Sequence, residues 1–145
     1  MAVKQTHNMK PLVVLGAGSW GTALSLHLAR NGNQVKLWSF DKNVYQQMKD
    51  TGENQSFLPG MPLPSHLVPY HDLEALFQDP FEDILIAVPS FAFASTLEKI
   101  APYTTPETRI LWATKGVSEE GALLHTLIQA KGYKHFGLLS GPSFA

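Results

Sequence analysis

The sequence predicts an α/β domain with a doubly wound parallel sheet. The prediction rests on the alternation of strand-like and helix-like segments and on the length and composition of the chain. Short apolar segments, typical of strands buried on both faces, alternate with segments of helical periodicity through five cycles. Parallel neighbouring strands need crossover connections, which these helices supply. The 145 residues, 44% of them hydrophobic, have the length and composition of one folded domain.

Apolar runs and the residues that interrupt them define the elements of the first half. Four aliphatic residues between Pro11 and Gly16 predict a strand. Leu24 and Leu28 then share one face of a helix that Asn31-Gly32 ends. Four prolines and little periodicity indicate a long loop before the middle of the chain. We expect a strand at 12–15, a helix at 20–31, a strand at 35–38, a helix at 42–49 and a loop at 53–71.

The second half repeats this alternation and contains the clearest strand. The run at 84–88 consists entirely of aliphatic residues. Phe93, Leu97 and Ile100 form one stripe of the next helix, which Ser90 can cap. We expect a short helix at 72–77, a strand at 84–88, a helix at 90–101, a strand at 109–113, a helix at 119–131 and a strand at 136–140.

Composition and charge exclude several classes of protein. Without cysteine, the chain has no disulfide scaffold, zinc–thiolate or iron–sulfur site, or cysteine nucleophile. A net charge of −1 lacks the basic footprint of a nucleic-acid-binding protein. No basic residue lies between Lys49 and Lys99, so we expect a solvated acidic face there and an anionic ligand elsewhere. The apolar run after Lys10 is too short for a membrane span, and we expect a soluble, cytoplasmic protein. We assign no metal ligands.

The first expected strand leads into Gly16-Ala17-Gly18-Ser19-Trp20-Gly21, a G-x-G-x-x-G pattern that opens a helix. In this context Gly16 permits a tight turn, Gly18 lets the backbone approach a pyrophosphate, and Gly21 allows close helix–strand packing. The N–H groups around Ser19 and Trp20 can bind phosphate with help from the helix dipole. The pattern therefore predicts a Rossmann-type dinucleotide-binding domain.

The residues after the second expected strand leave the choice between NAD and NADP open. NAD sites usually place an acid here for the ribose hydroxyls. This chain has Ser39 and Phe40 instead, with Asp41 one residue further. Ser39 neither repels nor clamps a 2′-phosphate, and Phe40 can pack on the adenine. We expect Asp41 to cap the following helix rather than to bind ribose.

Two later strand ends carry further candidates. Lys115 follows the fourth expected strand, at the edge where cofactor and substrate should meet, although a lone lysine there is more often a solvated loop residue. The fifth strand leads into Ser-Gly-Pro-Ser-Phe-Ala at 140–145. This segment is either an ordinary Gly-Pro turn or an anion cradle formed by backbone N–H groups and the Ser143 hydroxyl.

Taken together, these segments resemble the bacterial-type NAD(P)-dependent sn-glycerol-3-phosphate dehydrogenase family from about Leu12 to the last residue. They are Gly-Ala-Gly-Ser-Trp-Gly-Thr-Ala-Leu (16–24), Ala-Arg-Asn-Gly (29–32), Leu-Trp (37–38), Phe-Leu-Pro (57–59), Val-Pro-Ser (88–90), Trp-Ala-Thr-Lys-Gly (112–116) and Ser-Gly-Pro-Ser-Phe-Ala (140–145). The lysine and Gly-Pro motifs in this order are more specific than the glycine pattern alone.

The resemblance implies an oxidoreductase that interconverts dihydroxyacetone phosphate and sn-glycerol 3-phosphate by hydride transfer with NAD(P)H, for glycerophospholipid synthesis. Besides the three glycines, the implied cofactor contacts are Ser19, Trp20, Phe40, Lys115 and Ala145. The implied substrate contacts are Lys115, Gly141 and Ser143. Phe40 replaces the charged or polar residue of some members, which again leaves the cofactor preference open.

Members of the family continue into an all-helical domain that carries the proton-transfer lysine, and the full-length enzyme is a candidate homodimer. We therefore expect 1–145 to be the cofactor-binding domain, inactive alone, and assign no catalytic acid or base. His27, His125 and His135 are expected to be structural. Two alternatives stay open: a dehydrogenase of the same fold for another hydroxy acid or sugar phosphate, and a non-catalytic nucleotide-sensing module.

Overall fold

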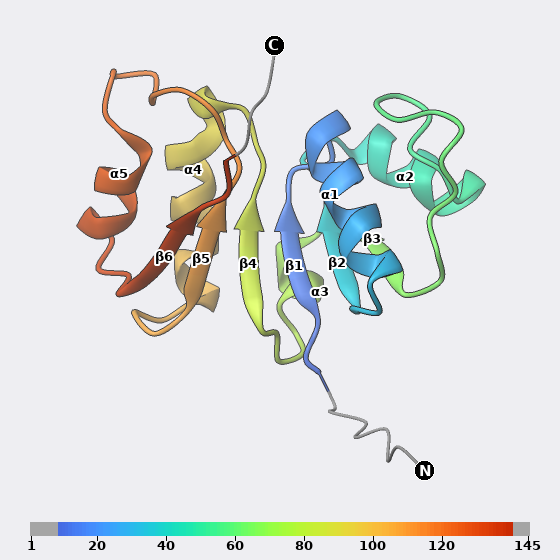
Figure 1. Ribbon diagram of the computed structural model, residues 1–145, viewed down its shortest axis with the longest axis horizontal. Helices are drawn as coiled ribbons and strands as arrows, with labels where there is room; N and C mark the ends of the chain where they lie inside the picture. The colour runs from blue at the N-terminus through green and yellow to red at the C-terminus, as the bar shows by residue number, and fades with distance from the viewer. Residues whose placement is uncertain (1–8, 141–145) are drawn as a thin grey trace.

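Six parallel strands form one sheet at the centre of the computed structural model, which describes residues 9–140 (Figure 1). In chain order they are β1 (Leu12–Leu15), β2 (Val35–Trp38), β3 (Leu67–Tyr70), β4 (Asp83–Ile86), β5 (Arg109–Trp112) and β6 (His135–Leu138). Their order across the sheet is β3-β2-β1-β4-β5-β6, so the direction of winding reverses between β1 and β4. The expected doubly wound parallel sheet is confirmed.

Helices cover both faces of the sheet (Figure 1). They are α1 (Ser19–Arg30), α2 (Lys42–Thr51), α3 (Leu73–Leu76), α4 (Ser90–Ile100) and α5 (Leu124–Ala130), with a 3₁₀ turn at Ala101–Tyr103. Alternate residues of β1 point to opposite faces: Val14 packs in one core with α1 and α2, whereas Val13 and Leu15 pack in another with α3, α4 and α5. Burial on both faces explains why the central strands are continuously apolar.

The sequence predicts five strands, and the structure adds one more, β3, within the stretch 53–71 where a loop is expected. Within residues 9–140, β3 is an edge strand whose one partner is β2. The carbonyl groups of His66 and Tyr70 accept hydrogen bonds from the β2 side. Alternation along the strand therefore turns the nitrogen of Pro69 outwards, where its missing N–H costs no ladder bond. Proline is compatible with this strand because the strand is at the edge.

The helix expected at 119–131 begins later, at Leu124. Before it the chain makes a closed turn, in which Ser118 and Ala122 exchange backbone and side-chain hydrogen bonds. Gly121, with a φ of +79°, makes this turn possible. The other expected elements agree with the structure to within two residues at each end.

Candidate functional site

The carboxyl ends of the central strands open into a groove with a volume of about 1210 Å³. It lies where the strand order reverses, the usual position of a ligand in such a sheet. The groove brings together Gly16, Gly18, Ser19, Trp20, Phe40 and Lys115. Gly21 packs directly against Gly16. The other expected site residues, Gly141, Ser143 and Ala145, lie outside the described residues.

The three glycines of the turn after β1 have different surroundings. A Cβ at Gly16, where φ is +115°, would lie 2.7 Å from the carbonyl oxygen of Ala87. A Cβ at Gly21 would lie 1.8 Å from the carbonyl oxygen of Gly16. A Cβ at Gly18 would meet no heavy atom of the described chain within 4 Å, apart from its own neighbours in sequence. Packing therefore requires glycine at 16 and 21, whereas Gly18 borders open space in the groove.

The amino terminus of α1 faces the groove without a side-chain cap. Gly18 is the N-cap residue, and its carbonyl accepts the first helical bond, from Thr22, at 2.9 Å. The Ser19 hydroxyl does not cap the helix; it donates to the carbonyl of Phe57 at 2.7 Å. The positive end of the helix dipole and the first N–H groups are thus directed at open space. This arrangement can bind a phosphate group.

A buried asparagine that the sequence analysis missed holds this turn in place. Asn54 is 0% exposed. Its Nδ2 donates to the carbonyl of Ala17 at 2.9 Å and to the Thr22 hydroxyl at 2.8 Å. Its Oδ1 accepts from the N–H of Phe57 at 3.2 Å. One side chain therefore fixes the glycine turn, the first turn of α1 and the loop that carries Phe57.

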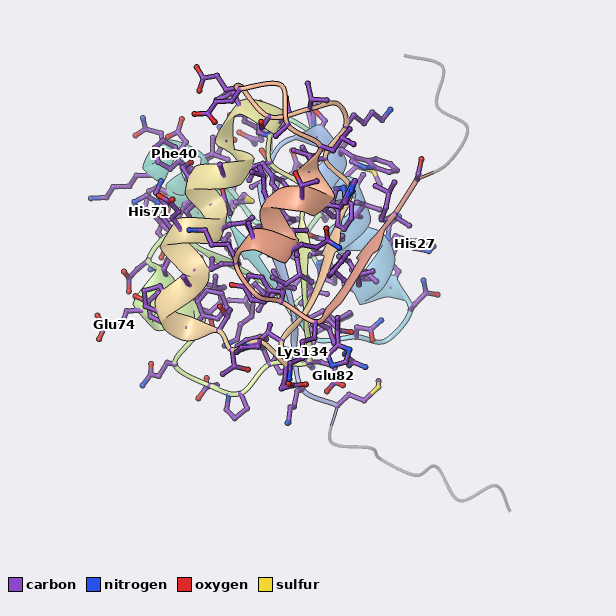
Figure 2. All side chains as sticks on the ribbon, turned by 90° about the vertical axis from the view of Figure 1, so that its left-hand side faces the viewer. His27, Phe40, His71, Glu74, Glu82 and Lys134 are labelled. Carbon is purple, nitrogen blue, oxygen red and sulfur yellow. The ribbon has the colours of Figure 1, made fainter. Side chains whose placement is uncertain are left out.

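Of the aromatic side chains that line the groove, four are 46% to 71% exposed: Trp20, Phe40, Phe57 and Phe91. Large exposed rings gathered in one hollow favour a ligand with flat apolar parts, such as a nucleotide base. Phe40, labelled in Figure 2, packs edge-on against Trp38 at 6.3 Å between ring centroids. The Nζ of Lys99 lies 4.5 Å from the centroid of the Phe40 ring.

Lys115 lies in the groove, as its position after a central strand predicted. The hydroxyl of the preceding residue, Thr114, donates to the carbonyl of Val88 at 2.7 Å. This buried bond ties the chain after β5 to the chain after β4. The next residue, Gly116, has a φ of +92°, a conformation that favours glycine, and also lines the groove. Lys115 is thus an exposed cation on a fixed turn.

The three histidines expected to be structural lie in different places. His27 shares a hydrogen bond with Asn31 at the end of α1, away from the groove (Figure 2). His135 pairs with Glu107 at 3.1 Å. His125, in the first turn of α5, lines the groove, which the sequence pattern did not predict.

The groups with shifted pKa values lie near the amino-terminal ends of the strands, at the opposite end of the sheet from the groove. Hydrogen bonds from Lys134 and His135 lower the pKa of the Glu107 carboxyl. The carboxylate of Asp83 raises the pKa of Arg109. Arg109 begins β5, whereas the groove lies beyond its carboxyl end. These ion pairs connect residues at or near the first residues of β4, β5 and β6, and they lie outside the groove.

Two further observations concern residues 9–140. None of their helices is long and apolar enough to cross a membrane. Their histidine, aspartate and glutamate side chains form no group of three or more that could hold a metal ion.

Comparison with known proteins supports the resemblance seen in the sequence. A family model described as the N-terminus of NAD-dependent glycerol-3-phosphate dehydrogenase matches residues 11–145. Glycerol-3-phosphate dehydrogenase [NAD(P)+] of Coxiella burnetii is 43% identical over 136 residues, covering 93% of this chain and 41% of the relative. The Haemophilus ducreyi protein of the same name is 43% identical over 143 residues, covering 97% and 42%.

Solved structures agree with this comparison. The 2.1 Å crystal structure of the Coxiella burnetii dehydrogenase matches with a TM-score of 0.88 at 42% identity, covering 94% of this chain and 42% of that chain. The Saccharomyces cerevisiae enzyme matches with a TM-score of 0.79 at 24% identity, which shows the fold alone, and covers 94% and 43%. The chain spans about two fifths of the length of these curated relatives.

We expect Asn54→Ala to loosen the glycine turn. The substitution leaves the carbonyl of Ala17 and the N–H of Phe57 without their partner, which should cost about 1–3 kcal/mol of folding stability. It should also weaken binding of a dinucleotide such as NADH. Urea unfolding and a fluorescence titration measure the two effects.

The matched control is Asn33→Ala, which removes one hydrogen bond to the carbonyl of Leu28 at the other end of α1. This control should leave dinucleotide affinity unchanged. Wild-type affinity in a folded Asn54→Ala variant would show that Asn54 does not position the turn.

Proposed function

Because this chain belongs to the NAD-dependent glycerol-3-phosphate dehydrogenase family, we propose that residues 1–145 form the NAD(P)H-binding domain of such an oxidoreductase. The proposed reaction converts dihydroxyacetone phosphate, NAD(P)H and a proton to sn-glycerol 3-phosphate and NAD(P)+. Its product would serve glycerophospholipid synthesis in the cytoplasm. The proton donor and most of the substrate pocket would lie in a helical domain of the whole enzyme, a candidate homodimer.

The environment of Gly18 carries this proposal. The glycine turn is packed without space at Gly16 and Gly21, yet it is open at Gly18, directly in front of the uncapped end of α1. A pyrophosphate suits this position, because the N–H groups of Ser19 and Trp20 can donate to its oxygens and the space in front of Gly18 is open among the described residues. The residues present therefore fit a dinucleotide.

The aromatic side chains support the same placement. Phe40 follows β2, where the adenosine half of a dinucleotide lies in this fold, and its ring can cover the adenine. When bound, the dinucleotide supplies the hydride, and the domain supplies binding and orientation. Gly141 and Ser143 are proposed to contact the substrate and Ala145 the cofactor. They follow Ser140, which lines the groove.

Lys115 is proposed to act at the substrate end of the groove. It lies beyond β5, on the other side of the glycine turn from Phe40. An ammonium group held there can stabilise negative charge on the substrate phosphate or on the alkoxide that develops during reduction. It can also contact the cofactor, as the family resemblance implies.

The alternatives raised by the sequence are not favoured. The relatives that match over more than nine tenths of the chain carry the name glycerol-3-phosphate dehydrogenase. A nucleotide-sensing module would not need a lysine in the groove next to Thr114, whose hydroxyl ties two strand ends together. Solved dehydrogenases named for other substrates, such as prephenate and D-mandelate, are only 11–22% identical to this chain and so share the fold alone.

We expect Gly18→Val to abolish most dinucleotide binding while the domain still folds. The backbone at Gly18, with φ −74° and ψ −175°, suits valine, and the added methyl groups project where phosphate oxygens would lie. The affinity for NADH and NADPH should fall about tenfold or more, or about 1.4 kcal/mol.

The comparison variant is Gly21→Ala, whose Cβ would overlap the Gly16 carbonyl and should lower the melting temperature. Unchanged NADH and NADPH affinities in a folded Gly18→Val variant would contradict the proposed pyrophosphate site.

We expect Lys115→Met to lower kcat/KM for dihydroxyacetone phosphate by roughly 10²–10³ in an active enzyme that contains this chain, because a positioned charge donor is lost. Lys131→Met, which removes an exposed lysine paired with Glu98, is the control. Near wild-type kcat/KM for Lys115→Met would mean that Lys115 is an ordinary loop residue.

A further inference from the structure

We propose that Lys99 binds the 2′-phosphate of NADPH and thereby gives this site a preference for NADPH over NADH. The inference rests on the proposed function, because it assigns one more contact to the same dinucleotide. It concerns a residue that the sequence motifs do not include.

The position of Lys99 is set by two elements that meet at the groove. Lys99 lies in the last turn of α4, and its side chain lines the groove. Its Nζ lies 4.5 Å from the centroid of the Phe40 ring. Phe40 follows β2, and the residues at this strand end contact the adenosine ribose of a bound dinucleotide. The ammonium group is therefore within reach of a group carried on the ribose 2′ position.

The residues after β2 supply no second cation for that group. Among the described residues that line the groove, the side chains charged at neutral pH are Asp41, Lys99 and Lys115. Lys115 belongs to the segment after β5, on the far side of the glycine turn. A phosphate at the β2 end can therefore pair only with Lys99 among these side chains.

The carboxylate that would favour NADH has another role. Asp41 is the N-cap of α2, and its Oδ1 accepts from the N–H of Asn43 at 2.7 Å. The hydroxyl of Ser39 donates to the Asp41 carbonyl at 2.9 Å rather than towards the groove. Asp41 would still repel a 2′-phosphate, so NADPH binding needs a compensating cation. Lys99 supplies it.

The contact with Phe40 leaves the ammonium available. A cation over an exposed ring is held weakly, whereas a phosphate monoester carries about −1.5 to −2 charge near pH 7. Lysine binds such a group as a point charge. Lys99 is also the first basic residue after Lys49, at the end of a stretch with eight acidic residues that would otherwise repel phosphate.

The test compares NADH and NADPH affinities of the wild-type chain and of Lys99→Met, measured by fluorescence titration. Wild type should bind NADPH more tightly than NADH. Lys99→Met should weaken NADPH binding by about tenfold or more, as for loss of a hydrogen bond between charged groups, and change NADH binding less than about twofold. Added salt should weaken NADPH binding to wild type more than to the variant.

Two further variants sharpen the result. Lys49→Met removes a lysine that lies 5.9 Å from the centroid of the Tyr45 ring and does not line the groove, so both affinities should stay unchanged. Asp41→Asn keeps a residue that can cap α2 but removes the negative charge. It should shift the ratio of affinities further towards NADPH.

Each contrary outcome has a distinct meaning. If Lys99→Met weakens NADH and NADPH equally, Lys99 contacts a part that they share, and the proposal is overturned. If Lys99→Met changes neither affinity, the proposal is overturned while the proposed function stands. If wild type binds neither dinucleotide, the proposed function fails and this proposal fails with it.

Discussion

The site depends on how closely the start of α1 approaches the turn after β1. A Cβ at Gly21 would lie 1.8 Å from the Gly16 carbonyl oxygen, and a Cβ at Gly16 would lie 2.7 Å from the Ala87 carbonyl oxygen. Because both positions lack a side chain, α1 begins at the centre of the sheet, between β1 and β4. Its amino terminus is therefore directed into the groove. A larger residue at either position would clash with these carbonyl groups and push the start of the helix away from the groove.

The rest of the groove is assembled around this contact by segments distant in sequence. Asn54 ties the loop before β3 to the glycine turn, and Thr114 ties the chain after β5 to the chain after β4. Exposed aromatic rings form the walls, and Lys99 and Lys115 place one cation on each side of the turn. Residues between Lys49 and Lys99 contribute to the groove, but none of the eight acidic side chains in that stretch lines it. The proposed anionic ligand would therefore meet helix N–H groups and lysines rather than these carboxylates.

The local parts of this architecture could be predicted from sequence. Apolar runs located five of the six strands in the described residues, and the order of strand, glycine turn and helix predicted that α1 begins at the candidate site. Each of these signals lies within a few consecutive residues. The edge strand β3 was missed, since Pro69 breaks a strand pattern except where its nitrogen faces outwards. Asn54 and Lys99 were missed because their partners are far away in the chain. Only the fold brings these residues into contact, and no periodicity or motif records it.

Binding at the amino terminus of α1 is tested most directly by amide chemical shifts of the ¹⁵N-labelled chain during titration with NADPH. The amides of Gly18, Ser19 and Trp20 should shift most, because their N–H groups lie where the pyrophosphate is expected to bind. The chemical shifts of amides at the amino-terminal ends of the strands, such as those of Arg109 and His135, should not change. Shifts confined to those strand ends, or no shifts at all, would contradict a dinucleotide site at the glycine turn.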